Sequence, residues 1–217
     1  MTKNHEFASD KKKKKDEYYT KVYAILPLLD YLEKGKTIWC PFDTEESNYV
    51  KVFRENGFNV ISGHIADGKD FFQYEPDNYD YIISNPPYSL RESILERLFK
   101  LEKPFAMLIN ISGLFDSRVR FNLFRNNPFE IMVFNKRVDY IKTEENNSSP
   151  PFSSIYLCSR LLPQQFVFEE ISKSKTGVNF TQAILTDSPI IIAKSNKILT
   201  DFTPDSTSRS FANAKGT

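Results

Sequence analysis

The chain has 217 residues, of which 40% are hydrophobic, so it can bury the core of one α/β domain with some extension beyond it. Its formal net charge is only +1 at pH 7. No global basic field therefore points to nucleic acid, and phosphate contacts have to come from local patches. The first residues contain no apolar signal region, and no apolar run approaches the roughly 18 residues of a membrane span. We expect a cytoplasmic protein without membrane contact, and the oligomeric state stays open.

Cysteine usage and motif content argue against several classes of protein. The two cysteines, Cys40 and Cys158, both fall in predicted strands, so buried thiols are expected rather than a disulfide framework. No cluster of residues has the spacing of a zinc site, and no phosphate loop is present. The sequence therefore predicts no metal, and it disfavours a nucleotide-processing enzyme.

The amino-terminal part divides into a tail and a helix. Residues 1–15 are polar, and the lysines at 11–15 are too charged to pack against a core, which predicts a disordered basic tail. Transient contact of this tail with a nucleic-acid backbone is the alternative. From residue 16 to 32 apolar residues recur at helical spacing, and Pro27 must kink or restart this helix.

Strands and helices then alternate. Residues 37–42 are apolar and β-prone and predict the first central strand. An acidic loop follows it, and a short helix begins at Ser47 and ends at Gly57. Residues 58–65 predict the second strand. This order is typical of an α/β domain.

The next strand ends in an unusual tetrapeptide. The β-type run at 80–84 is followed directly by Asn85-Pro86-Pro87-Tyr88. Two prolines cannot extend a central strand, so the backbone turns out of the sheet and Asn85 stands at the strand's carboxyl end, where open α/β sheets bind ligands. Ser89 and Glu92, three residues apart, predict a capping box that opens the following helix.

The tetrapeptide suits a planar amino group. The Asn85 Oδ1 atom and the Pro86 carbonyl are both acceptors, and neither proline has an N–H that would compete for them. Two converging acceptors can hold both hydrogens of an NH2 group and leave its lone pair facing an electrophile, while Tyr88 stacks on the ring that carries it. A proline turn without chemistry, or a proline-rich ligand segment, is the alternative.

The remaining elements continue a doubly wound pattern. Residues 103–112 predict a strand after a right-handed crossover, 116–125 a helix, 130–134 a strand, 141–151 a loop and 152–158 the last clear strand. After about residue 170 the chain is polar, apart from an apolar run at 189–193 that predicts an edge strand, and residues from 203 onward look disordered.

Cations outside the tail concentrate in one group, which predicts either a solvated face or phosphate contacts: Arg118, Arg120, Arg125, Lys136 and Arg137.

Asn85-Pro86-Pro87-Tyr88 resembles the signature of the S-adenosylmethionine-dependent amino-methyltransferases. The order of Tyr19-Thr20, the strand at 37–42 and then this tetrapeptide resembles the γ arrangement, and in detail the small adenine-N6 DNA methyltransferases of phages and prophages. The resemblance implies a Rossmann-like methyltransferase fold over residues 16–170, with a doubly wound, mostly parallel sheet of seven strands, one of them antiparallel. Residues 171–217 would be a partly disordered carboxyl-terminal extension.

The resemblance also implies S-adenosyl-L-methionine as cofactor. Asp43 would meet its amino group, His64 its ribose, and Asp70 with Phe71 its adenine. The glycines usual in the loop after the first strand are replaced by bulkier residues at 44–46, which implies a shifted loop, weaker cofactor binding or none. The full set of expected cofactor residues is Tyr19, Thr20, Cys40, Pro41, Phe42, Asp43, His64, Asp70 and Phe71.

The activity implied is methyl transfer to the N6 amino group of adenine in DNA, by positioning rather than by a protein nucleophile. Asn85, Pro86, Pro87 and Tyr88 would form the catalytic corner. Phe134, Arg137 and Tyr140 would hold the flipped base or its backbone. Related enzymes methylate guanine N2, RNA adenine or protein glutamine, so the substrate stays open. A degenerate methyltransferase fold that binds DNA or protein without catalysis, for instance to counter host defence, is a further alternative.

Overall fold

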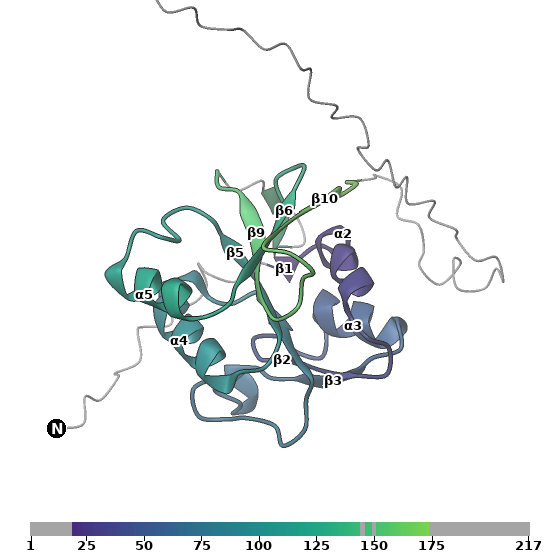
Figure 1. Ribbon diagram of the computed structural model, residues 1–217. Coiled ribbons are helices and arrows are strands. Elements are labelled where there is room, and N and C mark those ends of the chain that lie inside the picture. The colour runs from purple at the N-terminus through teal and green to yellow at the C-terminus, as the bar shows by residue number, and fades with distance from the viewer. Residues whose placement is uncertain (1–18, 144–145, 149–150, 174–217) are drawn as a thin grey trace, which may run out of the picture. The chain divides into compact units, whose positions relative to one another are not determined.

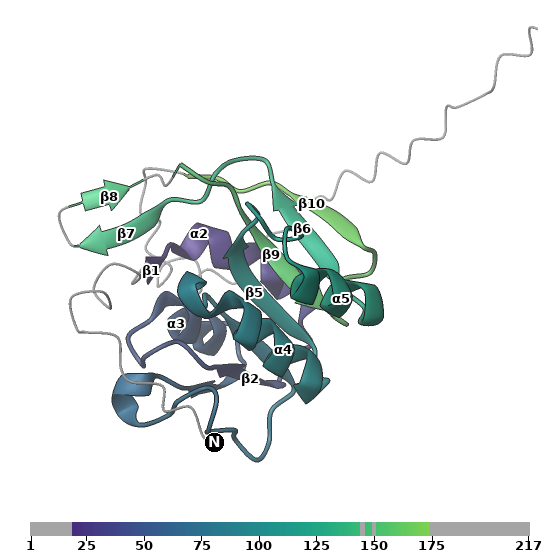
Figure 2. The same ribbon diagram turned by 90° about the vertical axis from the view of Figure 1, so that its left-hand side faces the viewer.

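The computed structural model describes residues 19–143, 146–148 and 151–173 (Figures 1 and 2). The predicted basic tail at 1–15, the edge strand at 189–193 and the disordered end from 203 lie outside the described residues. Among these residues, none of the helices combines the length and the apolar character that a membrane span requires.

The centre of the fold is a seven-stranded sheet. In spatial order its strands are β10 (Phe166–Glu169), β6 (Glu130–Phe134), β9 (Ser154–Ser159), β5 (Phe105–Asn110), β4 (Tyr81–Ser84), β2 (Thr37–Cys40) and β3 (Asn59–Ser62). β9 runs antiparallel to both of its neighbours, and every other pair in the sheet is parallel. This confirms the predicted fold class, a Rossmann-like α/β fold with a mostly parallel, doubly wound sheet and one antiparallel strand.

Helices cover both faces of this sheet (Figure 1). One face packs against α2 (Val22–Ile25), the 3-10 helix η1 (Leu26–Tyr31) and α3 (Asn48–Glu55), and the other against α4 (Arg91–Leu101) and α5 (Arg118–Asn126). Side chains alternate along β2, so Ile38 and Cys40 belong to the first core cluster and Trp39 to the second. Each fully buried large apolar side chain contributes about 1.5–3 kcal/mol to stability.

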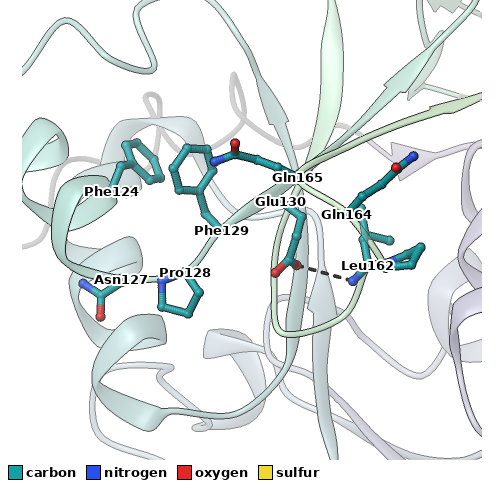
Figure 3. Close-up of a pocket in the computed structure, with 9 residues that line it drawn as sticks. Phe124, Asn127, Pro128, Phe129, Glu130, Leu162, Gln164 and Gln165 are labelled. Carbon is teal, nitrogen blue, oxygen red and sulfur yellow. Dashed lines mark hydrogen bonds between the residues drawn. The ribbon is translucent and has the colours of Figure 1, made fainter.

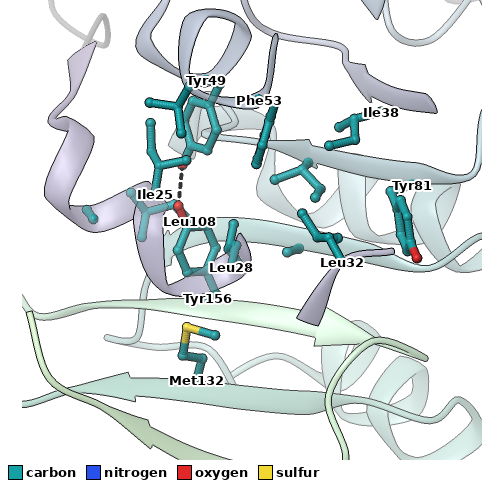
Figure 4. Packing of buried hydrophobic residues seen from close by; sticks show 14 of the residues in the cluster. Ile25, Leu28, Leu32, Ile38, Tyr49, Phe53, Tyr81, Leu108, Met132 and Tyr156 are labelled. Carbon is teal, nitrogen blue, oxygen red and sulfur yellow. Dashed lines mark hydrogen bonds between the residues drawn. The ribbon is translucent and has the colours of Figure 1, made fainter. Parts of the chain in front are cut away.

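The first cluster contains a buried polar pair (Figure 4). The hydroxyls of Tyr49 on α3 and Tyr156 on β9 lie 2.9 Å apart, so each satisfies the other inside an apolar environment. Burial raises the pKa of both phenols well above the usual value, and both are therefore neutral.

The helix predicted after the first strand is confirmed. α3 begins after Ser47, whose side chain accepts a hydrogen bond from the Val50 N–H at 3.3 Å. It ends before Gly57, whose φ of 82° is the left-handed conformation that favours glycine. The strands predicted at 37–42, 58–65, 103–112, 130–134 and 152–158 are also present, with ends shorter by a few residues, except that β6 keeps the predicted bounds and β9 extends to Ser159. Cys40 and Cys158 are buried free thiols in strands, as predicted.

The helix predicted over 16–32 is wrong at its start. The described chain begins with a short strand, β1 (Tyr19–Thr20), and helical structure covers only α2 and η1. Pro27 lies at the start of η1, where its missing N–H costs no hydrogen bond. The pairing partner of β1 is far along the chain, and local periodicity could not reveal it.

The capping box is also wrong. Ser89 is exposed inside a 3-10 turn, η3 (Tyr88–Leu90), and Leu90 is the residue that precedes α4. The Glu92 carboxylate instead accepts hydrogen bonds from Ser117 Oγ at 2.7 Å and Arg120 Nη1 at 3.1 Å. A charged partner on the neighbouring helix thus replaces the local cap and joins α4 to α5.

The segment predicted as a loop at 141–151 contains a hairpin. β7 (Tyr140–Thr143) and β8 (Asn146–Ser148) pair with each other, and β7 also pairs antiparallel with β1, which gives a second sheet in the order β1-β7-β8 (Figure 2). The polar composition of this segment hid the strands, because their pairing uses backbone groups rather than apolar side chains. β10 was also missed, since of its four residues only Val167 is buried.

Candidate functional site

The tetrapeptide at 85–88 lies at the centre of the carboxyl edge of the sheet. β4 ends at Ser84 between β2 and β5, and the chain then leaves the sheet through Asn85, Pro86 and Pro87. Pro86 is buried, while Asn85 and Tyr88 are half-buried. The predicted position of this corner at a strand's carboxyl end is therefore confirmed, and its geometry leaves the Tyr88 ring partly open to the outside.

Tyr88 is held from the side of β7 and β9. Its hydroxyl donates to the Tyr140 hydroxyl at 3.2 Å, and Tyr140 in turn lies 2.7 Å from Ser154 Oγ. The Phe152 ring meets the Tyr88 ring edge to face, with centroids 5.6 Å apart and planes at 89°. Three residues that are distant in sequence thus fix the aromatic member of the corner.

A buried carboxyl group lies on the other side of the corner. Asp43, in the loop after β2, accepts a hydrogen bond from Ser84 Oγ at the end of β4 and another from the Ser47 hydroxyl. Burial raises the pKa of Asp43 to about 6, and the two serine bonds partly oppose this shift. Both partners are neutral, and among the described residues the Asp43 carboxylate forms no ion pair. A buried acid without a cation next to it favours binding a positively charged group.

The loop that lacks glycines is fixed by charges. The Glu45 carboxylate accepts from Ser62 Oγ at 2.5 Å and from Arg54 Nη1 at 2.5 Å, and Glu46 pairs with Lys51 at 2.7 Å. The bond to Arg54 first, and that to Ser62 second, lower the pKa of Glu45 to about 2. The acidic loop is therefore joined both to α3 and to the end of β3.

The chain after β3 crosses the end of β2 at Gly63. The Gly63 N–H donates to the Cys40 carbonyl at 2.9 Å, and Gly63 also forms an isolated antiparallel bridge with Asp43. A Cβ atom at this position would lie 3.1 Å from Trp39 Nε1 and 3.3 Å from Pro41 Cα, closer than packed carbon atoms normally approach. Only glycine fits this crossing without displacement, and the crossing brings the loops after β2 and β3 together.

The structure brings Thr20 to the same edge of the sheet. Thr20 is buried and is the register partner of Tyr140, and its carbonyl accepts from Asn48 Nδ2 at 2.8 Å. Tyr19, by contrast, is half-exposed. β1 therefore joins the first turn of α3, on the Asp43 side, to the strand that carries the Tyr88 anchor.

Other expected cofactor residues have structural partners. Cys40 and Pro41 are buried, and burial raises the pKa of the Cys40 thiol well above its usual value. His64 Nδ1 caps a short 3-10 turn, η2 (Ile65–Asp67), by accepting from the Ala66 N–H at 3.2 Å. Asp70 accepts from the Phe72 N–H at 3.0 Å, which stabilises the turn that follows it. A ligand-binding role for these residues stays a prediction.

Phe71 belongs to the core. Its ring lies 5.0 Å from the Phe42 ring and 5.4 Å from the Trp39 ring, and the Arg97 guanidinium stacks over it at 5.3 Å. The neighbouring Phe72 is the exposed ring of the pair. The Phe71 ring therefore packs in the core, and its role as an adenine contact stays a prediction.

For two of the predicted substrate residues, Phe134 and Arg137, a role in holding the base stays a prediction. Phe134 packs on Tyr156 with ring centroids 5.8 Å apart, and Arg137 is exposed. Of the predicted phosphate contacts, Arg120 is held by Glu92 and by the carbonyls of Gly113 and Leu114. The others are exposed: Arg118, Arg125, Lys136 and Arg137.

A hollow of about 390 Å³ lies at the opposite, amino edge of the sheet (Figure 3). It is open to solvent, and its central carboxylate, Glu130, is occupied by the backbone N–H groups of Arg160, Leu161 and Leu162. Both oxygens of the Glu130 carboxylate therefore already accept hydrogen bonds within the fold. The residues that line it are Phe124, Asn127, Pro128, Phe129, Glu130, Leu162, Pro163, Gln164 and Gln165.

The sequence did not reveal three residues of the site. Ser84 directly precedes the tetrapeptide, and its place as the last residue of the strand was a usable signal. Phe152 and Ser154 gave none, because their contribution depends on the antiparallel insertion of β9 between β5 and β6.

No model of a protein family matches the chain, and no curated protein matches it in sequence. Among solved structures, the chain is similar to the "modification subunit of a putative type I restriction enzyme from Vibrio vulnificus YJ016", with a TM-score of 0.46 and 11% sequence identity. The match covers 74% of this chain and 48% of that one, so the chain spans about half the length of that subunit.

Proposed function

We propose that this chain is an S-adenosylmethionine-dependent methyltransferase that methylates the N6 amino group of adenine in DNA. The observation that carries the proposal is the Asn85-Pro86-Pro87-Tyr88 corner at the carboxyl end of a central parallel strand. The buried Asp43 carboxyl group lies beside the start of this corner, and at its end the Tyr88 ring is held by Tyr140. This is where doubly wound sheets bind ligands.

The corner acts by holding an amino group in position. The target adenine leaves the DNA stack, at a cost of a few kcal/mol, and enters beside Asn85. The Asn85 Oδ1 atom and the Pro86 carbonyl accept the two N6 hydrogens, and the half-exposed Tyr88 ring stacks on the base. The nitrogen lone pair then faces away from both acceptors, and no protein nucleophile is required.

The donor set near β2 fits the cofactor. When bound, S-adenosylmethionine supplies an activated methyl group. Within the part of the chain that the structure describes, the Asp43 carboxyl is bonded to neutral hydroxyls. It is suited to the ammonium of the methionine part, because a cation there would offset the cost of burying its charge. Thr20, Pro41 and Phe42, which belong to the same proposed set of cofactor residues, lie on the elements that flank Asp43.

The test is an Asn85→Ala variant of the full chain, assayed with labelled S-adenosylmethionine and adenine-containing duplex DNA. We expect methylation to fall by at least about a hundredfold, because positioning of the amino group is lost, with unchanged cofactor affinity by calorimetry. Asn78→Ala, in an exposed loop, is the matched control. An Asn85→Ala enzyme that methylates at the normal rate would remove the role given to this residue.

One observation favours a second candidate, a methyltransferase fold that binds a partner without catalysis. The loop after β2 has Glu45 in place of a small residue, and this side chain is bonded to the end of β3. Calorimetric titration with S-adenosylmethionine separates the two. Heat of binding near one equivalent supports the enzyme, and silence at high micromolar concentration supports the binding module. RNA adenine and glutamine-containing peptides, tested in parallel with DNA, decide the acceptor.

A further inference from the structure

Tyr140 has no surface from which to touch a substrate. Its exposed fraction is 0%, and it lies in the first core cluster although it was a candidate for holding the base. Its hydroxyl is nevertheless next to the corner, 3.2 Å from the Tyr88 hydroxyl. Any effect of Tyr140 on a bound base therefore has to pass through Tyr88.

The hydroxyl groups form a continuous chain of hydrogen bonds. Each hydroxyl has one hydrogen to donate and can accept in return. Tyr88 donates to Tyr140, and the Tyr140 hydroxyl shares a second hydrogen bond with Ser154 Oγ, 2.7 Å away, in which either oxygen can be the donor. Ser154 is 3% exposed and is the first residue of β9, so the chain of bonds ends on the central sheet.

These contacts remove the freedom of the Tyr88 ring. The side chain has two rotatable torsions, and Pro86 and Pro87 already stiffen its backbone. The bond to Tyr140 holds the far end of the ring, and Phe152 packs on it edge to face at 89°. A ring fixed before binding loses little conformational entropy when a base stacks on it.

We propose that Tyr140 is a positioning residue that, through Ser154 behind it and Phe152 beside it, sets the plane of the Tyr88 ring for stacking on the target base. The reference to a base rests on the proposed function. The anchoring of the ring does not depend on it, because every contact that carries it lies within the chain.

The same strand links this anchor to the other side of the site. Tyr140 is the first residue of β7 and the register partner of Thr20, whose carbonyl is bonded to Asn48 on α3. The anchor is therefore connected, by strand pairing and one hydrogen bond, to α3, the helix that follows the Asp43 loop. Such a connection favours in-line attack, which requires that the two reactants be held in a defined geometry.

The experiment uses Tyr140→Phe, which keeps the ring and removes the hydroxyl. We expect the single-turnover methylation rate to fall about three- to tenfold, the range expected for loss of one neutral hydrogen bond, with unchanged cofactor affinity. Tyr88→Phe should give a loss of the same size, and the double variant no more than either single variant, because both remove the Tyr88–Tyr140 hydrogen bond. Tyr31→Phe is the control, since its hydroxyl bonds Glu169 instead. Additive losses, or no loss in Tyr140→Phe, would overturn the proposal.

A second measurement separates the anchor from the enzyme. NMR of the full chain with labelled tyrosine reports flipping of the Tyr88 ring without any substrate. We expect faster flipping in Tyr140→Phe, and a smaller increase in Ser154→Ala, which keeps the Tyr88–Tyr140 bond and serves if Tyr140→Phe fails to fold. If the variants show faster flipping but the unsubstituted protein methylates nothing, the anchoring of Tyr88 is supported and the proposed function is contradicted. Unchanged flipping in both variants removes the anchor.

Discussion

The two sides of the carboxyl edge are held by different kinds of interaction. Around Tyr88 the contacts are neutral hydroxyls and ring edges, from Tyr140, Ser154 and Phe152. Around Asp43 they are carboxylates, with Glu45 bonded to Arg54 and Ser62. The neutral side keeps its geometry across pH and salt, whereas the acidic side changes with both. This difference predicts that conditions which leave the base position intact alter cofactor binding.

Of the substitutions that test this difference between the two sides, Asp43→Asn is expected to have the largest effect. At pH 7 the folded protein holds a charged carboxyl whose pKa is raised from 3.8 to about 6, which costs about 3 kcal/mol of stability. The amide removes this charge while still accepting from Ser84, so we expect the free energy of unfolding to rise by up to about 3 kcal/mol. Binding of S-adenosylmethionine should fall at least tenfold. Denaturant unfolding and calorimetry measure the two effects.

The pH dependence of the unsubstituted protein tests the direction in which Asp43 affects stability. The folded-state pKa of Asp43 is above its unfolded value, so its contribution to stability is fully present below pH 3.8 and is lost as the pH rises through about 6. Cofactor affinity should run the other way and weaken below pH 6, where the carboxyl is protonated. Asp43→Asn should flatten both profiles between pH 4 and 7. An unchanged affinity profile in this variant would contradict the ammonium contact.

An intermediate effect is expected from Tyr88→Ala. Stacking of a base on an aromatic ring is worth about 1–3 kcal/mol, so kcat/KM for DNA methylation should fall about five- to 150-fold. Cofactor affinity should not change, because Asp43 and its partners are untouched. Tyr88→Phe, which keeps the ring, should lose only about the three- to tenfold expected from removal of its hydroxyl. If Tyr88→Ala and Tyr88→Phe lower kcat/KM by the same factor, the ring does not stack on the base.

The smallest effect is expected from Glu45→Gln. The carboxylate pKa is lowered to about 2, so its contribution to stability is present above pH 4.5 and is lost as the pH falls toward 2. Because the Glu45 side chain is 57% exposed and the Arg54 side chain 46%, solvent screens the pair, and we expect a loss below about 1 kcal/mol. The loss should shrink further in high salt. A drop of several kcal/mol would show that this loop supports more of the fold than its exposure implies.

Elements with strong side-chain periodicity were predictable from the sequence. The strand at 130–134 and the helix after Ser47 follow from apolar runs and a local cap, and the structure confirms both. The position of Asn85 followed from the two prolines alone. In each case the deciding interaction lies within a few residues of the chain.

Features that depend on distant partners were not predictable. The pairing of Tyr19 with Ile141 turned an expected helix start and an expected loop into strands. Glu92, expected in a capping box, instead accepts hydrogen bonds from Ser117 and Arg120. Local patterns carry no information on contacts between segments so far apart.

The position of β9 late in the sequence but in the middle of the sheet has a consequence for the order in which the protein matures. Ser154, at the start of β9, pairs with Asn110 at the end of β5, and Ser159 pairs with Phe105. During synthesis the Asn85-Pro86-Pro87-Tyr88 corner emerges from the ribosome well before the strand that steadies it. A nascent or truncated chain that stops short of β9 would carry the motif with a loose aromatic ring. Only insertion of this late strand between β5 and β6 completes the site.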